Sequence, residues 1–182
     1  MPRAFLMALL GLGLGCSQPS NATPAGDPIM SIEVTSTAFQ QGTTIPKQYT
    51  GDGVDQSPPL RWSEPPAGTK SLALICDDPD APVGTWVHWV LFNLPAETRE
   101  LKEGLPTTET LKNGAKQGKN DFGKIGYGGP APPKGKPHRY FFKIYALDRA
   151  LDLTPGATKA RLEAAMKGHV LAEGQLMGTY KR

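Results

Sequence analysis

Cysteine is scarce in this sequence of 182 residues, which contains only Cys16 and Cys76. A disulfide-stapled fold and a cysteine-rich zinc site both need more cysteines than this. Cys76 follows the apolar run 72–75. We therefore expect Cys76 to be a buried free thiol rather than a nucleophile.

The net charge is also small, and histidines are few. The formal net charge is only +3, and nucleic-acid binding would favour clustered basic residues and a more basic domain. The three histidines are far apart, with no His-x-x-x-His or His-Glu-x-x-His pair, and Gly-x-Ser-x-Gly does not occur. We expect no nucleic-acid partner, no cofactor and no metal site.

Long apolar runs are missing except for one near the N-terminus. Residues 4–15 follow Arg3 and are too few to span a bilayer, which is typical of an export signal. The run ends at Cys16 and resembles the lipobox of bacterial lipoproteins, in which the cysteine becomes the lipidated N-terminus. Gly13 stands where that motif usually has leucine. The alternative is a simple secretory signal that is cut nearby.

These features divide the chain into three parts. We expect a lipoprotein signal peptide at 1–16, a flexible polar tether at 17–29 and one folded domain at 30–182. A lipid on Cys16 would anchor the domain to a membrane of the cell envelope, on the periplasmic side or at the cell surface.

Glycine and proline, by contrast, are abundant, with 21 and 18 copies, and they punctuate the chain with turns. Alternating or continuous apolar segments of strand length predict a mainly β fold. The expected strands are 30–37, 60–63, 71–76, 86–92, 139–147 and 175–181.

Helices are expected to be few. Thr158 is a plausible N-cap, and Leu162, Met166 and His169 fall on one apolar stripe of the helix that would follow. Gly174 comes after its expected end. A second, weaker helical turn is predicted at 96–101.

A cluster of carboxylates follows the apolar strand 71–76 directly. Asp77, Asp78 and Asp80 are costly at this position unless they are paired, hydrogen-bonded or solvated. His88 lies in the next strand and, by alternation, would share a face with Trp86, Val90 and Phe92. It could then face the aspartates across adjacent strands. The alternatives are a rigid Asx turn and a core histidine.

The connection 113–137 is rich in glycine, proline and lysine and has no apolar period. Loops of this length are often functional. The Gly129–Pro130 segment could offer backbone N–H groups to an anion, although a plain Gly/Pro loop is the alternative. His138 opens the aromatic strand that follows, and Arg139 could pair with an aspartate of the cluster.

In this order, the motifs at 78–82, 86–89, 128–130 and 138–140 resemble the phosphatidylethanolamine-binding protein family, especially its bacterial, Raf kinase inhibitor-like branch. The resemblance covers about residues 30–182. It implies an antiparallel, Greek-key-like β-sandwich with a few peripheral helices and one shallow anion pocket. By the family's motifs, the pocket is lined by Asp78, His88, Gly129, Pro130, His138 and Tyr140, and braced by Asp80 and Arg139.

Two features depart from the family pattern. The bacterial branch commonly has cysteine where Ala131 stands, which puts a thiol-dependent role of that loop in doubt. The long C-terminal helix that gates the pocket of mammalian members is not evident. The family's name of kinase inhibitor is therefore not taken literally here.

Three functions follow from this reading. The first is non-catalytic binding of small anions or phosphorylated head groups, with a possible regulatory role. The second is inhibition by docking on an envelope protease or another protein target. The third is a hydrolase that would use Asp78 and His88 as an acid–base pair.

The lipobox generates a direct test. Cys16→Ser should release the protein from membranes into the soluble envelope fraction, because the lipid is the expected anchor. Fractionation measures the release, and mass spectrometry of the mature N-terminus is the control. A mature protein that starts at a residue other than Cys16 would contradict the prediction.

Overall fold

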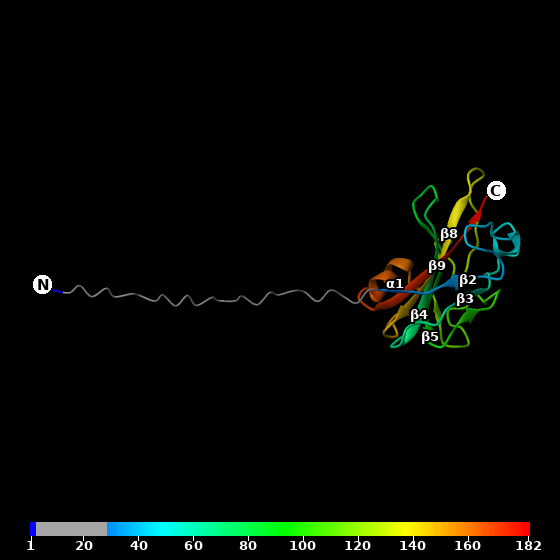
Figure 1. Ribbon diagram of the computed structural model, residues 1–182. Helices are drawn as coiled ribbons and strands as arrows, with labels where there is room; N and C mark the ends of the chain where they lie inside the picture. The colour runs from blue at the N-terminus through cyan, green and yellow to red at the C-terminus, as the bar shows by residue number, and fades with distance from the viewer. Residues whose placement is uncertain (3–28) are drawn as a thin grey trace.

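The computed structural model describes residues 1–2 and 29–182, and strands account for most of its regular structure (Figure 1). Cys16 and all but the last residue of the tether expected at 17–29 lie outside the described residues. Within the described part, no helix is both long and apolar enough to cross a membrane. The mainly β prediction is confirmed.

The strands match most of the apolar segments in the sequence. One short 3-10 helix, η1 (Lys47–Tyr49), and one α-helix, α1 (Lys159–Met166), accompany them. The strands are β1 (Met30–Ser31), β2 (Val34–Thr35), β3 (Leu60–Trp62), β4 (Ser71–Asp78), β5 (Trp86–Pro95), β6 (Glu100–Leu101), β7 (Lys116–Gln117), β8 (His138–Leu147) and β9 (Val170–Tyr180).

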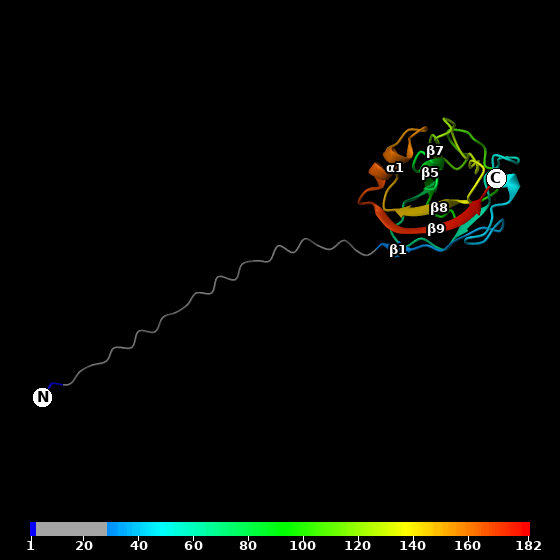
Figure 2. The same cartoon turned by 90° about the horizontal axis from the view of Figure 1, so that it is seen from above.

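Six strands form one sheet in the order β1-β9-β8-β4-β5-β7. All eight residues of the central strand β4 are buried, as its continuous apolar run predicts. Neighbouring strands are antiparallel except at the edge, where β1 runs parallel to β9 (Figure 2). The expectation of a purely antiparallel architecture is therefore wrong at β1, because the chain enters alongside β9 instead of turning back from it.

The three remaining strands form a smaller sheet in the order β2-β3-β6. Its apolar side chains pack together with those of the larger sheet in one main core. The Greek-key description stays a prediction. Members of the main core from the two sheets include Val34, Leu60, Trp62, Leu101, Leu74, Trp89, Leu91, Tyr140 and Phe142.

A second, smaller core lies beneath α1. The Thr158 side chain accepts a hydrogen bond from the Arg161 amide and caps the helix, as predicted. Leu162 and Met166 are the buried residues of α1. This helix-side core also contains Ala73, Ile75, Val87, Val90 and Phe92 from β4 and β5.

A β-bulge in β5 changes which side chains share a face. Cys76 pairs with Trp89, but the next residue, Asp77, pairs with Val87, so His88 is an extra residue in β5. Trp89 lies in the main core and Val90 in the helix-side core. His88 contacts Tyr140 of the main core. The expectation that His88 shares a face with Val90 and Phe92 is therefore wrong, because simple alternation cannot foresee a bulge.

The C-terminal third departs from the sequence prediction at two points. Helix α1 ends at Met166, so His169 lies outside it, with Nδ1 3.0 Å from Oδ1 of Asp148. Gly174 does not terminate a helix but lies inside β9, where it pairs with Ile144.

Short strands account for the other two differences. The segment predicted as a helical turn at 96–101 ends in strand β6. The first predicted strand, 30–37, is divided into β1 and β2, which belong to different sheets.

Gly174 is required by the close approach of two backbones. A Cβ atom at this position would lie 1.8 Å from the carbonyl oxygen of Ile32 and 2.7 Å from its carbon. Since both are backbone atoms, no side-chain rotation relieves the clash. The hydrogen bond from the Ile32 amide to the Glu173 carbonyl, at 2.8 Å, holds the two segments together.

We expect Gly174→Ala to lower the free energy of unfolding by at least about 2 kcal/mol, because the β1 segment must move away from β9. Urea unfolding measures the loss. The matched control is Gln175→Ala at the exposed neighbouring position, which should stay within about 0.5 kcal/mol of wild type. Equal stability of the two variants would show that this contact does not hold the edge strand.

Candidate functional site

A cavity of about 310 Å³ opens where β4, β5 and β8 meet the loops that follow or precede them. Strand β4 ends at the cavity with Asp78, and β5 and β8 begin there with Trp86 and His138. Its lining consists of Asp78, Ala81, Pro82, Val83, Trp86, His88, Phe122, Ala131, Pro132, Pro133, His138 and Tyr140. Four of the residues that the sequence analysis expects to bind a ligand thus line one cavity, namely Asp78, His88, His138 and Tyr140.

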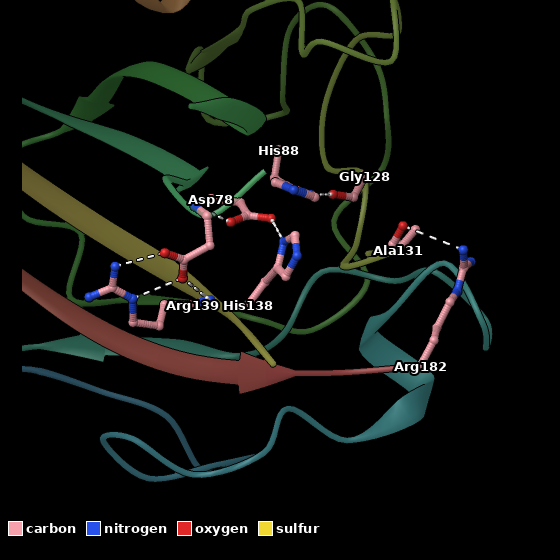
Figure 3. Close-up of polar contacts among 8 residues, drawn as sticks. Asp78, His88, Gly128, Ala131, His138, Arg139 and Arg182 are labelled. Carbon is pink, nitrogen blue, oxygen red and sulfur yellow. Dashed lines mark hydrogen bonds and ion pairs between the residues drawn. The ribbon is translucent and has the colours of Figure 1, made fainter. Parts of the chain in front are cut away.

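Asp78 and His138 form the central hydrogen bond of the site (Figure 3). The Nδ1 atom of His138 lies 2.8 Å from Oδ2 of Asp78, and both residues are buried. The other carboxylate oxygen, Oδ1, accepts a hydrogen bond of 2.8 Å from the Asp80 amide. Asp78 is thus paired with His138 across β4 and β8. The hydrolase alternative expected Asp78 to pair with His88, and this pair is not formed.

The two bracing residues occupy the outer side of this pair. Arg139 donates from Nε to Oδ2 and from an Nη2 N–H to Oδ1 of Asp80, both at 2.8 Å, and its amide donates to Oδ2 at 2.9 Å. This bidentate pair lowers the pKa of Asp80 to about 2, chiefly through the hydrogen bonds from the guanidinium. The arrangement fixes the turn after β4 against the start of β8, as predicted.

Asp77 belongs to the opposite side of the sheet. Its carboxylate is buried and accepts hydrogen bonds from Lys143 of β8, at 2.8 and 3.0 Å, and from Lys159 of α1. Of the three aspartates of the cluster, Asp77 and Asp80 form ion pairs that stabilise the fold, and Asp78 lines the cavity. Strand alternation explains the division, because neighbouring residues of β4 point to opposite faces.

His88 is held by the loop that lies along β5. Its Nδ1 atom is 2.6 Å from the carbonyl oxygen of Gly128, which can only accept, so Nδ1 carries the proton. Burial lowers the pKa of His88, and this outweighs the hydrogen bond to Gly128 and the nearby carboxylates, which raise it. His88 is consequently neutral at pH 7, with Nε2 as an acceptor.

The long connection is not structureless, contrary to the sequence prediction. It contains β7 and then follows the edge of β5, where the amides of Gly118, Asp121 and Gly128 donate to β5 carbonyl groups at 2.8–2.9 Å. The Asp121 carboxylate in turn accepts a hydrogen bond of 2.7 Å from the Val87 amide. These hydrogen bonds satisfy the backbone polar groups along the edge of β5, which would otherwise be unpaired. They also hold the glycine-rich loop in place against β5.

Asn120 organises the tight turn within this loop. Its side-chain amide donates to the Gly126 carbonyl, and its Oδ1 accepts from the amides of Phe122 and Lys124. The side chain is buried, so these bonds satisfy a group that would otherwise be costly. The sequence analysis gives Asn120 no role.

Gly129 and Pro130 lie behind the cavity and do not line it. The Gly129 amide donates to Oδ1 of Asp55 at 2.6 Å, and the Pro130 carbonyl accepts from Gly51 at 2.9 Å. The preceding amide, that of Gly128, donates to the His88 carbonyl. These amides are therefore directed at other protein groups, and the expected backbone anion nest is not formed toward the cavity.

Two buried donors at the cavity have no hydrogen-bond partner among the described residues, namely the indole N–H of Trp86 and the hydroxyl of Tyr140. Tyr140 is 1% exposed, and burial raises the pKa of its hydroxyl well above the usual range, with a smaller contribution from the Asp78 carboxylate, which lies near the hydroxyl but outside hydrogen-bond geometry. Trp86 had been placed beside His88 by alternation, but its indole N–H was not foreseen as a site donor.

Phe122 completes the site, and nothing in its sequence position signalled this role. Its ring meets the rings of Trp86 and His88 edge to face, with centroids 5.4 Å apart in both cases. A side chain at Gly128 would collide with this ring, because its Cβ would lie 2.8 Å from Phe122. Glycine at 128 therefore lets the aromatic wall close over His88.

The chemistry of the cavity is that of a hydrogen-bonding floor in an apolar enclosure. Across residues 1–2 and 29–182, no group of three or more His, Cys, Asp or Glu side chains is arranged to hold a metal ion. The floor offers N–H and O–H donors beside a paired carboxylate. Such a set can orient a small oxyanion.

Comparison with known proteins gives consistent matches over the folded part. A family model described as "Phosphatidylethanolamine-binding protein" matches residues 35–181. A UPF0098 protein of Aquifex aeolicus is 52% identical over 160 residues, which cover 87% of this chain and 92% of that protein. A UPF0098 protein of Methanothermobacter thermautotrophicus is 54% identical over 145 residues, which cover 80% and 95%.

Two solved structures have similar folds. A phosphatidylethanolamine-binding protein homolog from Chlamydia trachomatis has a TM-score of 0.76 at 44% identity, covering 84% of this chain and 98% of that one. YbcL of E. coli, described as a new member of the mammalian PEBP family, has a TM-score of 0.78 at 34% identity, covering 84% and 99%.

The environment of His88 predicts a pH dependence of folding. The pKa of His88 in the folded protein should lie below about 6.5, the ordinary histidine value, because burial disfavours its charged form. Below about pH 6.5 the unfolded chain binds this proton and the folded chain does not, so the free energy of unfolding falls as the pH drops.

An NMR titration of the imidazole signals measures the pKa, and urea unfolding at about pH 7.5 and 5.5 measures the stability change. His88→Gln should lose this part of the pH dependence, whereas His169→Gln, the matched control, should keep it. A His88 that titrates at or above 6.5 would contradict the prediction.

Proposed function

The chain belongs to the phosphatidylethanolamine-binding protein family, and we propose that the cavity at Asp78 binds small anions or phosphorylated head groups without catalysis. One observation carries the proposal. The Trp86 N–H and the Tyr140 hydroxyl are buried at this cavity without a partner in the described part of the chain. A buried donor that lacks an acceptor is costly, and an oxyanion would satisfy both donors.

The charges around the floor select the protonation state of the ligand. The Asp78 carboxylate already places one negative charge there, so a second anionic oxygen close to it would be repelled. Neutral His88 presents Nε2 as an acceptor and can receive a hydrogen bond from a protonated ligand oxygen. We propose that the site takes a monoanion with one protonated oxygen, or a zwitterionic head group, in preference to a bare dianion.

Binding without turnover is supported by how the polar groups are engaged. Both oxygens of Asp78 accept hydrogen bonds, from His138 and from the Asp80 amide. The Nδ1 atom of His88 is bonded to a backbone carbonyl, so no hydrogen-bonded carboxylate strengthens His88 as a base. These contacts support binding better than the hydrolase alternative, and among residues 29–182 we find no contact that favours the inhibitor alternative.

The biological setting is part of the same proposal. A lipid on Cys16 would place the binding domain at the cell envelope, where it could act as a regulator that responds to an anionic ligand. The residues that would carry the anchor lie outside the described part.

Tyr140→Phe tests the proposal with two readouts that move in opposite directions. Removing the unpartnered hydroxyl should leave the free energy of unfolding unchanged or slightly higher, because an unsatisfied buried group is lost. The same change should weaken phosphate binding about tenfold, because one hydrogen bond to a charged ligand is removed. Wild-type affinity is expected between about 1 mM and about 10 μM.

Isothermal titration with inorganic phosphate and thermal unfolding without ligand provide the two measurements. Tyr145→Phe is the control, because Tyr145 lies on β8 but packs against the helix-side core. Unchanged phosphate affinity in Tyr140→Phe, or equal loss in both variants, would refute binding at this cavity.

A further inference from the structure

The cavity has a polar floor and apolar walls. The apolar walls indicate which substituent the anionic group of the ligand carries. The wall residues are Ala81, Pro82, Val83, Phe122, Ala131, Pro132 and Pro133. We infer that the preferred ligand is a phosphomonoester or similar monoanion with an apolar alkyl or aryl substituent. This inference rests on the proposed function and adds the class of substituent.

The walls expose apolar surface that a bare anion would leave in water. Val83 is 78% exposed and Phe122 is 41% exposed, although both line the cavity. Exposed large apolar side chains at the rim of a cavity indicate a binding surface. An apolar substituent that covers them removes apolar area from water on both partners, which a phosphate oxygen cannot do.

The cavity is also larger than the polar floor requires. Cavities of roughly 300–1,000 Å³ accommodate small organic ligands, and this one measures about 310 Å³. Its polar groups come from Asp78, His88, His138, Tyr140 and Trp86, whereas the loops above them contribute only apolar side chains to the lining. A ligand that fills the cavity therefore has a polar end at the floor and an apolar end at the mouth.

The walls are held in place before any ligand arrives. Phe122 is fixed by edge-to-face contacts with Trp86 and His88. Prolines at 82, 132 and 133 restrict the backbone of the two facing loops. Because little conformational entropy is lost on binding, contacts with these walls are converted into affinity efficiently.

Affinities of the full-length chain for three probes test the inference, namely inorganic phosphate, phenyl phosphate and O-phosphorylethanolamine. Phenyl phosphate should bind about tenfold more tightly than inorganic phosphate, and also more tightly than O-phosphorylethanolamine. Val83→Ser should remove about half of the tenfold gain on a logarithmic scale, measured as the ratio of the phenyl phosphate and inorganic phosphate affinities of the same variant. Val54→Ser is the matched control, because Val54 is 74% exposed and does not line the cavity.

The outcomes separate the two proposals. If inorganic phosphate does not bind, the proposed function fails. If it binds but phenyl phosphate is no tighter, or O-phosphorylethanolamine is the tightest probe, the assignment of an apolar substituent is overturned. Equal effects of Val83→Ser and Val54→Ser on phenyl phosphate would also overturn it, because the wall would then not be the determinant.

Discussion

Two neighbouring carboxylates are buried at the end of the central strand. The groups that pair with them determine how the site is built. Asp77 is 1% exposed and Asp78 is 3% exposed. Removing one partner of a buried ion pair costs about 3–5 kcal/mol, so each carboxylate needs its own partners. Because the two side chains point to opposite faces of the sheet, the partners come from different parts of the chain.

The helix and the cavity are consequences of the same constraint. Asp77 draws Lys159 of α1 and Lys143 of β8 to one face, which ties the only α-helix of the described part to the sheet. Asp78 draws His138 to the other face and forms the floor of the cavity. An ionic contact that secures the fold and a polar contact that prepares a binding site thus begin at adjacent residues of β4.

The sequence was informative wherever residue type alone determines the outcome. Apolar runs predicted β4, β5 and β8, and the N-cap at Thr158 predicted the start of α1. It was misleading where pairing determines the outcome. The face of His88 depends on a bulge, Gly174 depends on the Ile32 carbonyl, and the loop after β7 depends on the free edge of β5. None of these partners is near in sequence, so local patterns do not encode them.

Because of the bulge, the number of residues in β5 can change at this position without a change in how β5 pairs with β4. His88 is a surplus of one residue, since Cys76 and Asp77 already pair with the residues on either side of it. Deleting the single codon for His88 would remove the register shift between Cys76 and Asp77 and leave each remaining side chain on its present face, while the second shift, between Leu72 and Leu74, would stay. Among the groups of the cavity, His88 is therefore the one that a lineage could gain or lose by a change in chain length, while β4 and β5 stay paired as they are.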